Sequence, residues 1–200
     1  YYANLYKKDG LKGGHIIILN AGGSEFFKES KKQAIEALSA YPKGMQIGGG
    51  VTAVNAQDYI KAGASHVIVT SYVFKDGRVN YGNLKSLVEA VGKERIVLDL
   101  SCRKKDGQYY IVTDRWQKFT DEVVNIETLK KLSEYCDEFL VHGVDVEGKS
   151  GGMEEDLVAM LSEFNDIPIT YAGGISNMEQ IERFREISNG KMDFTIGSAL

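Results

Sequence analysis

Short apolar runs alternate with longer segments in which apolar residues recur every three or four positions, a pattern typical of strands followed by amphipathic helices. We expect strands at seven short runs: 15–19, 45–48, 66–70, 95–99, 138–142, 168–171 and 193–197. The longer segments predict helices over 31–40, 54–62, 81–92, 125–136, 153–164 and 177–188, and 1–10 suits a further helix before the first strand. Strands that are apolar throughout, each followed by a helix, indicate a parallel sheet covered by helices.

The connection 101–124 is long and polar, and it interrupts this alternation. Its stretch "KKDGQYYIV" carries the turn signal Asp106-Gly107, which predicts a β-hairpin. Asn125 and Asn177 each precede a helical segment with a glutamate close behind, so both are expected to cap helices.

Seven strand–helix steps predict the α/β class and a (β/α)8 TIM barrel whose first strand precedes residue 1. We expect one barrel domain over 1–200, truncated at both ends, because barrels of this type usually need about 250 residues. A doubly wound open sheet is the alternative. It usually carries one glycine-rich phosphate loop near its first strand, whereas this chain has two glycine clusters far apart.

The two glycine clusters, "QIGGGV" at 46–51 and "YAGGIS" at 171–176, occupy matching places in the two halves of the chain. Each is followed by a helix and then by a strand that ends near a serine. The matching residues are Gly49, Gly50 and Ser71 in the first half and Gly173, Gly174 and Ser198 in the second. Exposed amides at such turns bind phosphate. The repeat therefore predicts two anion sites for a substrate with two phosphates, and duplicated turns without a ligand are the alternative.

The composition is that of an ordinary globular protein, with 43% hydrophobic and 26% charged residues among 200. A net charge of −4 argues against a general nucleic-acid or membrane partner. Two cysteines give no disulfide framework and favour a reducing compartment. His15, His66 and His142 are scattered and show no ligand spacing, so we expect no metal.

Candidate catalytic groups follow the fourth and fifth of the predicted strands. Asp99 closes "RIVLD" and should project from the carboxyl end of its strand, where barrel enzymes place their active sites. The next residues do not open a helix, which weakens a capping role for Asp99. Asp145 and Glu147 add carboxylates nearby, and His142 is either a core histidine or a catalytic group. Carboxylates beside a phosphate site suit general acid–base work on a sugar phosphate.

Six stretches together resemble one known family: "MQIGGGV", "HVIVTSYVF", "RIVLDLSCRKKDGQYYIV", "FLVHGVDVEGKSGG", "YAGGIS" and "FTIGSAL". The chain resembles the eukaryotic form of the histidine-biosynthesis isomerase, phosphoribosylformimino-5-aminoimidazole carboxamide ribotide isomerase. The most diagnostic pieces are "VLDLSCRKKDG" and "DVEGKSGG", because glycine clusters alone occur in several phosphate-binding barrels.

The resemblance implies a two-fold repeated barrel that performs an Amadori rearrangement, from the aminoaldose ProFAR to the aminoketose PRFAR, without a metal or organic cofactor. Asp99 matches the family's general acid, and Trp116 matches a loop tryptophan near the carboxamide-imidazole end of the substrate; a plain hydrophobic contact is the alternative for Trp116. Asp145 falls in the family's sixth-strand segment, aligned loosely. The remaining matches are phosphate ligands: Gly49, Gly50 and Ser71 for one phosphate and Gly173, Gly174, Gly197 and Ser198 for the other.

The resemblance also implies a general base, an aspartate that ends a first strand just before residue 1. The 200 residues alone are therefore expected to be inactive. Two other functions stay open: a cyclase of the same pathway, which needs ammonia from a glutaminase partner, and a non-catalytic sugar-phosphate binding module. We expect a monomer that binds a small ribotide and no nucleic acid or membrane, located in the cytoplasm, or in a plastid if the source is a plant.

Overall fold

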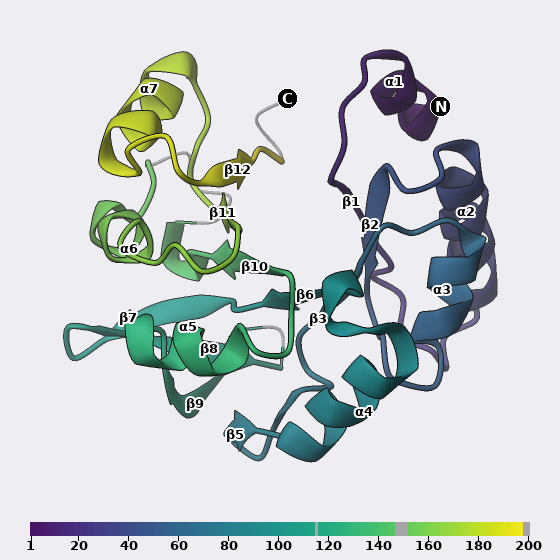
Figure 1. Ribbon diagram of the computed structural model, residues 1–200, viewed down its shortest axis with the longest axis horizontal. Coiled ribbons are helices and arrows are strands. Elements are labelled where there is room, and N and C mark those ends of the chain that lie inside the picture. The colour runs from purple at the N-terminus through teal and green to yellow at the C-terminus, as the bar shows by residue number, and fades with distance from the viewer. Residues whose placement is uncertain (115, 147–151, 198–200) are drawn as a thin grey trace. The chain divides into compact units, whose positions relative to one another are not determined.

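Residues 1–114, 116–146 and 152–197 are described by a computed structural model (Figure 1). Seven strands form one sheet, and each lies within two residues of a predicted strand. They are β1 Gly14–Ile17, β2 Met45–Gly48, β3 Val67–Val69, β6 Ile96–Asp99, β10 Glu138–His142, β11 Ile169–Ala172 and β12 Asp193–Thr195.

The order of strands in this sheet follows the order of the chain: β1-β2-β3-β6-β10-β11-β12. Pairing is parallel where His15 lies opposite Gln46 and where Val141 lies opposite Tyr171. A doubly wound sheet reverses direction at a switch point, and no reversal occurs among these strands. The topology is that of a (β/α)8 barrel, which confirms the predicted fold class.

The chain divides into two compact units, one of Tyr1–Val73 with Asn80–Val97 and one of Phe74–Val79 with Leu98–Leu200. Strand β6 supplies its first half to unit 1 and its second half to unit 2. The expectation of one domain over the whole length stays a prediction.

Unit 1 packs helices against β1, β2 and β3. The helices are α1 Tyr2–Lys8, α2 Phe27–Ala40, α3 Ala56–Ala62 and α4 Tyr81–Val91, followed by the short 3-10 helix η1 Lys93–Arg95. Figure 1 shows α2 and α3 together on one side of β1 and β2. The core of unit 1 includes four fully buried side chains: Leu38, Ile47, Leu84 and Leu87.

Unit 2 packs three helices beside β10, β11 and β12: α5 Ile126–Leu132, α6 Glu155–Leu161 and α7 Met178–Ile187, with the 3-10 helix η2 Val144–Val146 after β10. Asn125 and Asn177 cap α5 and α7, as predicted. Their side-chain oxygens accept hydrogen bonds from the backbone amides of Thr128 and Gln180, each at 2.9 Å. Aromatic rings fill the core, where Tyr171 and Phe184 pack at 5.9 Å between centroids.

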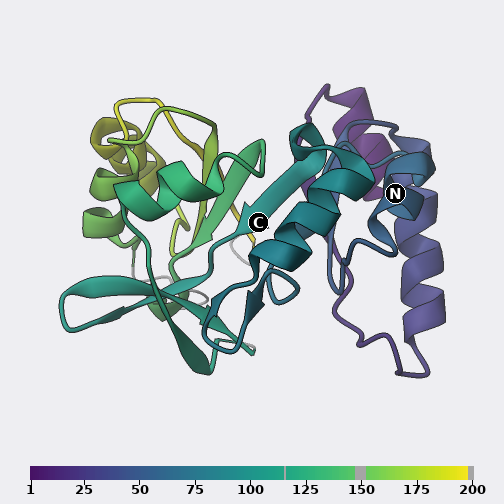
Figure 2. The ribbon, with the colours of Figure 1, turned by 60° about the horizontal axis from the view of Figure 1, so that its bottom comes forward.

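The connection after β6 is a three-stranded antiparallel sheet rather than a simple hairpin: β7 Cys102–Lys105, β8 Gln108–Thr113 and β9 Lys118–Val123. The predicted turn is present, with positive φ at Asp106 and Gly107. Figures 1 and 2 show β7 and β8 as a ribbon that projects from unit 2. A second small hairpin, β4 Phe74–Lys75 with β5 Arg78–Val79, was not predicted.

No helix in the described ranges is long and apolar enough to cross a membrane.

Candidate active site

Asp99 is the last residue of β6, and its side chain is 17% exposed. The three residues before it are fully buried apolar side chains, so the strand is covered on both faces until it reaches this carboxylate. After Asp99 two residues lead into β7 without a helix, and the Leu100 amide donates to the Leu140 carbonyl at 2.8 Å. Asp99 is thus a strand-end carboxylate and not a helix cap, as predicted.

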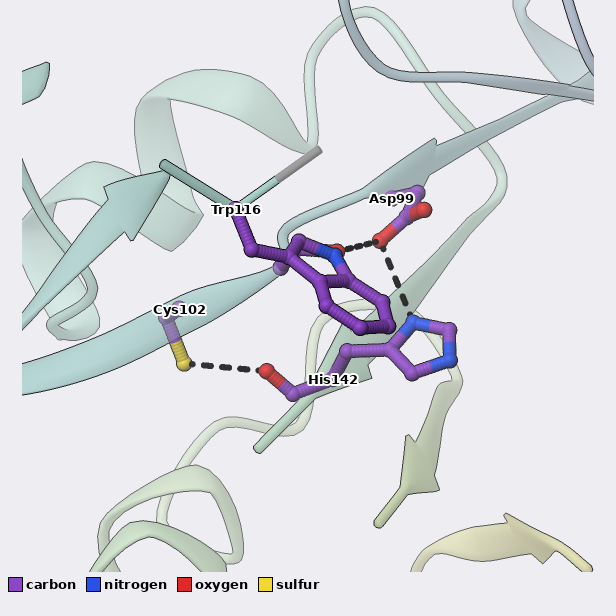
Figure 3. A network of polar contacts seen from close by, with 5 residues as sticks. Asp99, Cys102, Trp116 and His142 are labelled. Carbon is purple, nitrogen blue, oxygen red and sulfur yellow. Dashed lines mark hydrogen bonds and ion pairs between the residues drawn. The ribbon is translucent and has the colours of Figure 1, made fainter. Parts of the chain in front are cut away.

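Three side chains gather around Asp99 (Figure 3). The Ser101 hydroxyl donates to Asp99 Oδ1 at 3.0 Å, and His142 Nδ1 lies 3.4 Å from the same oxygen. The Trp116 indole N–H donates to Ser101 Oγ at 3.2 Å, and the Trp116 and His142 rings lie 6.5 Å apart between centroids. His142 is therefore a neighbour of the candidate acid, whereas its sequence position allowed a plain core role equally well.

Trp116 has a φ of 68°. The left-handed region is uncommon for any residue with a side chain, and a bulky aromatic there is an outlier. The residue is 42% exposed. The backbone is thus held in a disfavoured conformation at Trp116, whose indole reaches from the β8–β9 connection to Ser101.

Cys102 lies next to this network but does not join its chemistry. The thiol is buried and contacts the His142 carbonyl at 3.5 Å. Burial raises the pKa of the Cys102 thiol well above its usual range, and the charges of Asp99, Glu154 and Asp145 raise it further. Because the thiolate is the nucleophile and this thiol stays protonated, Cys102 is a packing residue.

Asp145 lies in η2, and its carboxylate accepts hydrogen bonds from two residues of β7. Arg103 Nε donates to its Oδ1 at 2.8 Å, and the Lys104 amide donates to its Oδ2 at 3.0 Å. Its side chain is 28% exposed. The substrate-binding role assigned to Asp145 by resemblance stays a prediction, and its contacts here attach β7 to the segment after β10.

A second attachment is made by Glu154, the residue before α6. The Tyr109 hydroxyl donates to Glu154 Oε2 at 2.9 Å, and the Glu154 amide donates to Tyr171 Oη at 3.0 Å. Burial, followed by the hydrogen bond to Glu154, raises the pKa of Tyr109 above its usual range. The phenol is therefore a neutral donor that joins β8 to the beginning of α6.

The two glycine turns repeat the same backbone geometry. In unit 1 the Ile18 amide donates to the Gly48 carbonyl, and in unit 2 the Gly143 amide donates to the Ala172 carbonyl, both at 2.9 Å. The next residues, Gly49 and Gly173, have φ of 98° and 125°. A Cβ on Gly49 would collide with the Ile18 carbonyl, and one on Gly173 would lie 2.8 Å from the Gly143 carbonyl.

The first glycine of each pair is thus required by close packing of two backbones, whether or not a ligand binds. Gly50 and Gly174 also have positive φ, at 67° and 76°. Space beside Gly50 is open, since an added Cβ would meet nothing within 4 Å. The geometric repeat is real, and the phosphate assignments stay predictions.

The other predicted phosphate residues follow neighbouring strands. Ser71 is exposed in the turn after β3, and β3 pairs with β2, which leads to Gly49. Gly197 is exposed after β12, which pairs with β11, the strand that leads to Gly173. Ser198 and Glu147 lie outside the described residues.

Ser101 is the functional candidate that sequence reasoning missed. A signal was available, because Ser101 is two residues after Asp99 and an extended chain places such residues on one side. Among the described residues, no group of three or more His, Cys, Asp or Glu side chains could hold a metal ion.

The profile of the family described as histidine biosynthesis protein matches residues 1–200. The chain belongs to this family. Its curated relatives include a chloroplastic isomerase from Medicago truncatula, 56% identical over 199 residues, which cover 100% of this chain and 62% of the relative. Isomerases with the same substrate in their names, from Neurospora crassa and Saccharomyces cerevisiae, are 43% and 41% identical; each alignment covers 100% of this chain and 76% of the relative.

The chain thus spans less than two thirds of the Medicago relative and about three quarters of the fungal ones. The names of these family members specify an isomerase of an imidazole-4-carboxamide that carries two phosphoribosyl groups. The resemblance inferred from the six quoted stretches is confirmed at the level of the family and its eukaryotic members.

Proposed function

We propose that the protein to which this chain belongs is an aldose–ketose isomerase of histidine biosynthesis, which converts ProFAR to PRFAR by an Amadori rearrangement. The observation that carries the proposal is the cluster at the end of β6, where the Asp99 carboxylate meets Ser101, His142 and Trp116. The names of the family's relatives supply the substrate, whose two phosphoribosyl groups suit two phosphate-binding turns.

Asp99 is the proposed general acid. It gives a proton to the ring oxygen of the aminoaldose ribose, so the ring opens to a Schiff base. A second carboxylate, assigned by resemblance to a strand that precedes residue 1, removes the proton from C2. The resulting enolamine tautomerises to the ketone. The steps move protons within one molecule and need no electron acceptor, so no organic or metal cofactor enters the proposal.

His142 is the proposed partner that restores the proton of Asp99 between turnovers. Its Nδ1 lies 3.4 Å from Asp99 Oδ1, a distance that is long for a hydrogen bond, and catalytic hydrogen bonds often tighten only when the substrate is bound. Histidine side chains commonly act as proton shuttles in catalytic sites. Trp116, partly exposed beside this pair, is the proposed aromatic surface for the carboxamide-imidazole ring.

Phosphate binding is assigned to the two glycine turns and the residues that follow the next strands. Gly49, Gly50 and Ser71 are the proposed ligands of one phosphate, and Gly173, Gly174, Gly197 and Ser198 of the other. The matched hydrogen bonds at Gly48 and Ala172 support this assignment, because they show the same local turn in both halves of the repeat.

The deciding experiment is turnover of the aminoaldose ribotide by the full-length protein and its Asp99→Asn variant. We expect the variant to bind the ribotide and lose turnover by about a thousandfold, since it keeps the shape of the side chain and removes the acid. Asp121→Asn is the matched control, because Asp121 is an exposed carboxylate paired with Arg78. Turnover of Asp99→Asn near that of Asp121→Asn would refute the assignment.

The same assay separates the other functions. A cyclase would consume ammonia and release an imidazole product, whereas a binding module would retain the ribotide without converting it. We further propose a monomer, to be tested by light scattering of the full-length protein. The cytoplasm is the proposed compartment, with a plastid as the alternative that the name of the Medicago relative supports; microscopy of the tagged full-length protein distinguishes them.

A further inference from the structure

Ser101 occupies the centre of the cluster around Asp99, between two groups that come from different elements. Its side chain lies on the segment between β6 and β7, and the residue is 2% exposed. The hydroxyl donates to Asp99 Oδ1 at 3.0 Å and accepts the Trp116 indole N–H at 3.2 Å. A buried hydroxyl with both a donor partner and an acceptor partner has a defined orientation.

The direction of these hydrogen bonds links the two partners. An indole N–H can only donate, so the Ser101 oxygen must accept from Trp116. The single hydroxyl proton of Ser101 then points to the Asp99 carboxylate, which accepts it. Loss of this one oxygen removes both contacts together.

Trp116 depends on such contacts, because its backbone is in the left-handed region at a φ of 68°. A bulky residue remains there only when its surroundings hold it. Two contacts of the indole hold it here: the hydrogen bond to Ser101 and the ring contact with His142 at 6.5 Å. Both of these contacted residues also touch Asp99 Oδ1.

We propose that Ser101 is a positioning residue that couples the orientation of the Asp99 carboxylate to the placement of the Trp116 indole. This inference rests on the proposed function, in which Asp99 is the acid and Trp116 faces the substrate base. In this arrangement the group that contacts the heterocycle and the group that donates the proton are joined through one hydroxyl. A shift of the Trp116 indole therefore moves the Ser101 hydroxyl and, with it, the Asp99 carboxylate.

The kinetic test compares Ser101→Ala with Ser101→Thr, Trp116→Phe and the double variant Ser101→Ala with Trp116→Phe in the full-length protein. We expect Ser101→Ala to lower kcat by about tenfold to a hundredfold, with a smaller change in KM, because a misplaced catalytic group costs rate. Ser101→Thr keeps the hydroxyl and should restore most of the turnover. The double variant should be no slower than the slower single variant, because both changes break the same link.

Emission gives a second readout that does not depend on turnover. Trp116 is the one tryptophan of the 200-residue sequence, so the difference between a protein and its Trp116→Phe form isolates its signal. We expect Ser101→Ala to shift this signal to longer wavelength, and Asp99→Asn to change it through the hydrogen bonds that Ser101 makes to both residues. Ser162→Ala is the matched control, since Ser162 is buried but donates to the Ala159 carbonyl of α6, the helix that ends just before it.

Wild-type kcat and emission in Ser101→Ala would overturn the inference, and so would full multiplication of the two single effects in the double variant. If the wild-type protein does not isomerise the ribotide, the proposed function fails, and the emission of Ser101→Ala and Asp99→Asn still decides whether the coupling exists. If Ser101→Thr does not fold, the double variant and the emission of Ser101→Ala decide.

Discussion

The three-stranded sheet β7–β9 is attached to the rest of unit 2 by side chains, and Tyr109→Phe tests which attachment matters most. Tyr109 is 7% exposed, and its hydroxyl donates to the Glu154 carboxylate at 2.9 Å. A hydrogen bond to a charged group contributes about 1.5–3 kcal/mol. Water can replace part of it, because Glu154 is only half-buried. We therefore expect Tyr109→Phe to lower the free energy of unfolding by about 1.5 kcal/mol.

The neighbouring ion pair should contribute less, although its distance is shorter. Lys104 Nζ lies 2.7 Å from Asp156 Oδ2, and the two side chains are 41% and 78% exposed. Exposed pairs usually contribute below about 1 kcal/mol because water screens them and ordering two long side chains costs entropy. Burial thus decides the ranking, and Lys104→Ala should have less effect than Tyr109→Phe.

The measurement is urea unfolding of the full-length variants, with the midpoint read at an unchanged slope. Tyr110→Phe is the matched control, because Tyr110 is the next residue of β8 and its hydroxyl contacts Gln108 Oε1 in an exposed position. That control should stay within about 0.5 kcal/mol of the wild type. Equal free energies of unfolding for Tyr109→Phe and Tyr110→Phe would refute the attachment by Tyr109.

The pH dependence gives a further check of the same contact. The pKa of Tyr109 is raised in the folded protein, so the stability that it contributes is complete below the usual tyrosine pKa of about 10. This contribution is lost as the pH rises from there through the raised value. The difference between wild type and Tyr109→Phe should therefore shrink in alkaline solution, and a difference that grows with pH would contradict the direction.

Two further predictions concern the thiols and the helix caps. Cys102 and Cys136 are buried thiols outside any disulfide, and burial raises the pKa of Cys102. Iodoacetamide at pH 8 should therefore leave both unmodified in the native protein and modify both in urea, as read by mass spectrometry. Native labelling of Cys102 would contradict its assignment as a packing residue. Asn177→Ala should lower the free energy of unfolding by about 1 kcal/mol, because it removes the acceptor for the Gln180 amide, whereas Asn177→Ser should keep most of it. Equal urea midpoints for the two Asn177 variants would exclude the cap.

The regular part of the fold could be predicted from the sequence because its signals are local. Runs such as "HVIVT" are apolar throughout, so they indicate buried parallel strands before any partner is known. Asn125 and Asn177 were found for the same reason, since a cap depends on the three residues that follow it. The third strand β9 was missed, because its pairing with β8 joins residues across a connection that carries no turn signal as clear as Asp106-Gly107.

The candidate site was predictable only in part. Asp99 could be placed because it ends an apolar strand. The partners of Asp99 and Asp145 could not, since His142 and Arg103 approach these carboxylates from 43 and 42 residues away along the chain. Ser101 was overlooked because its proposed role depends on a hydrogen bond from Trp116. That contact forms only in the folded β8–β9 connection, where Trp116 has an unusual backbone conformation.

The position of β7–β9 in the chain has a consequence for divergence within the family. This small sheet is inserted between β6 and α5, and its attachments through Arg103 and Tyr109 lie apart from Trp116 in the sequence. Substitutions around Trp116 would therefore leave both the anchoring contacts and the strand that carries Asp99 in place. A lineage could exchange the surface that we propose for the heterocycle, and so acquire a new substrate preference, while it keeps the strand of the proposed acid and the two glycine turns; the link from Trp116 through Ser101 to Asp99 would then have to change with that surface.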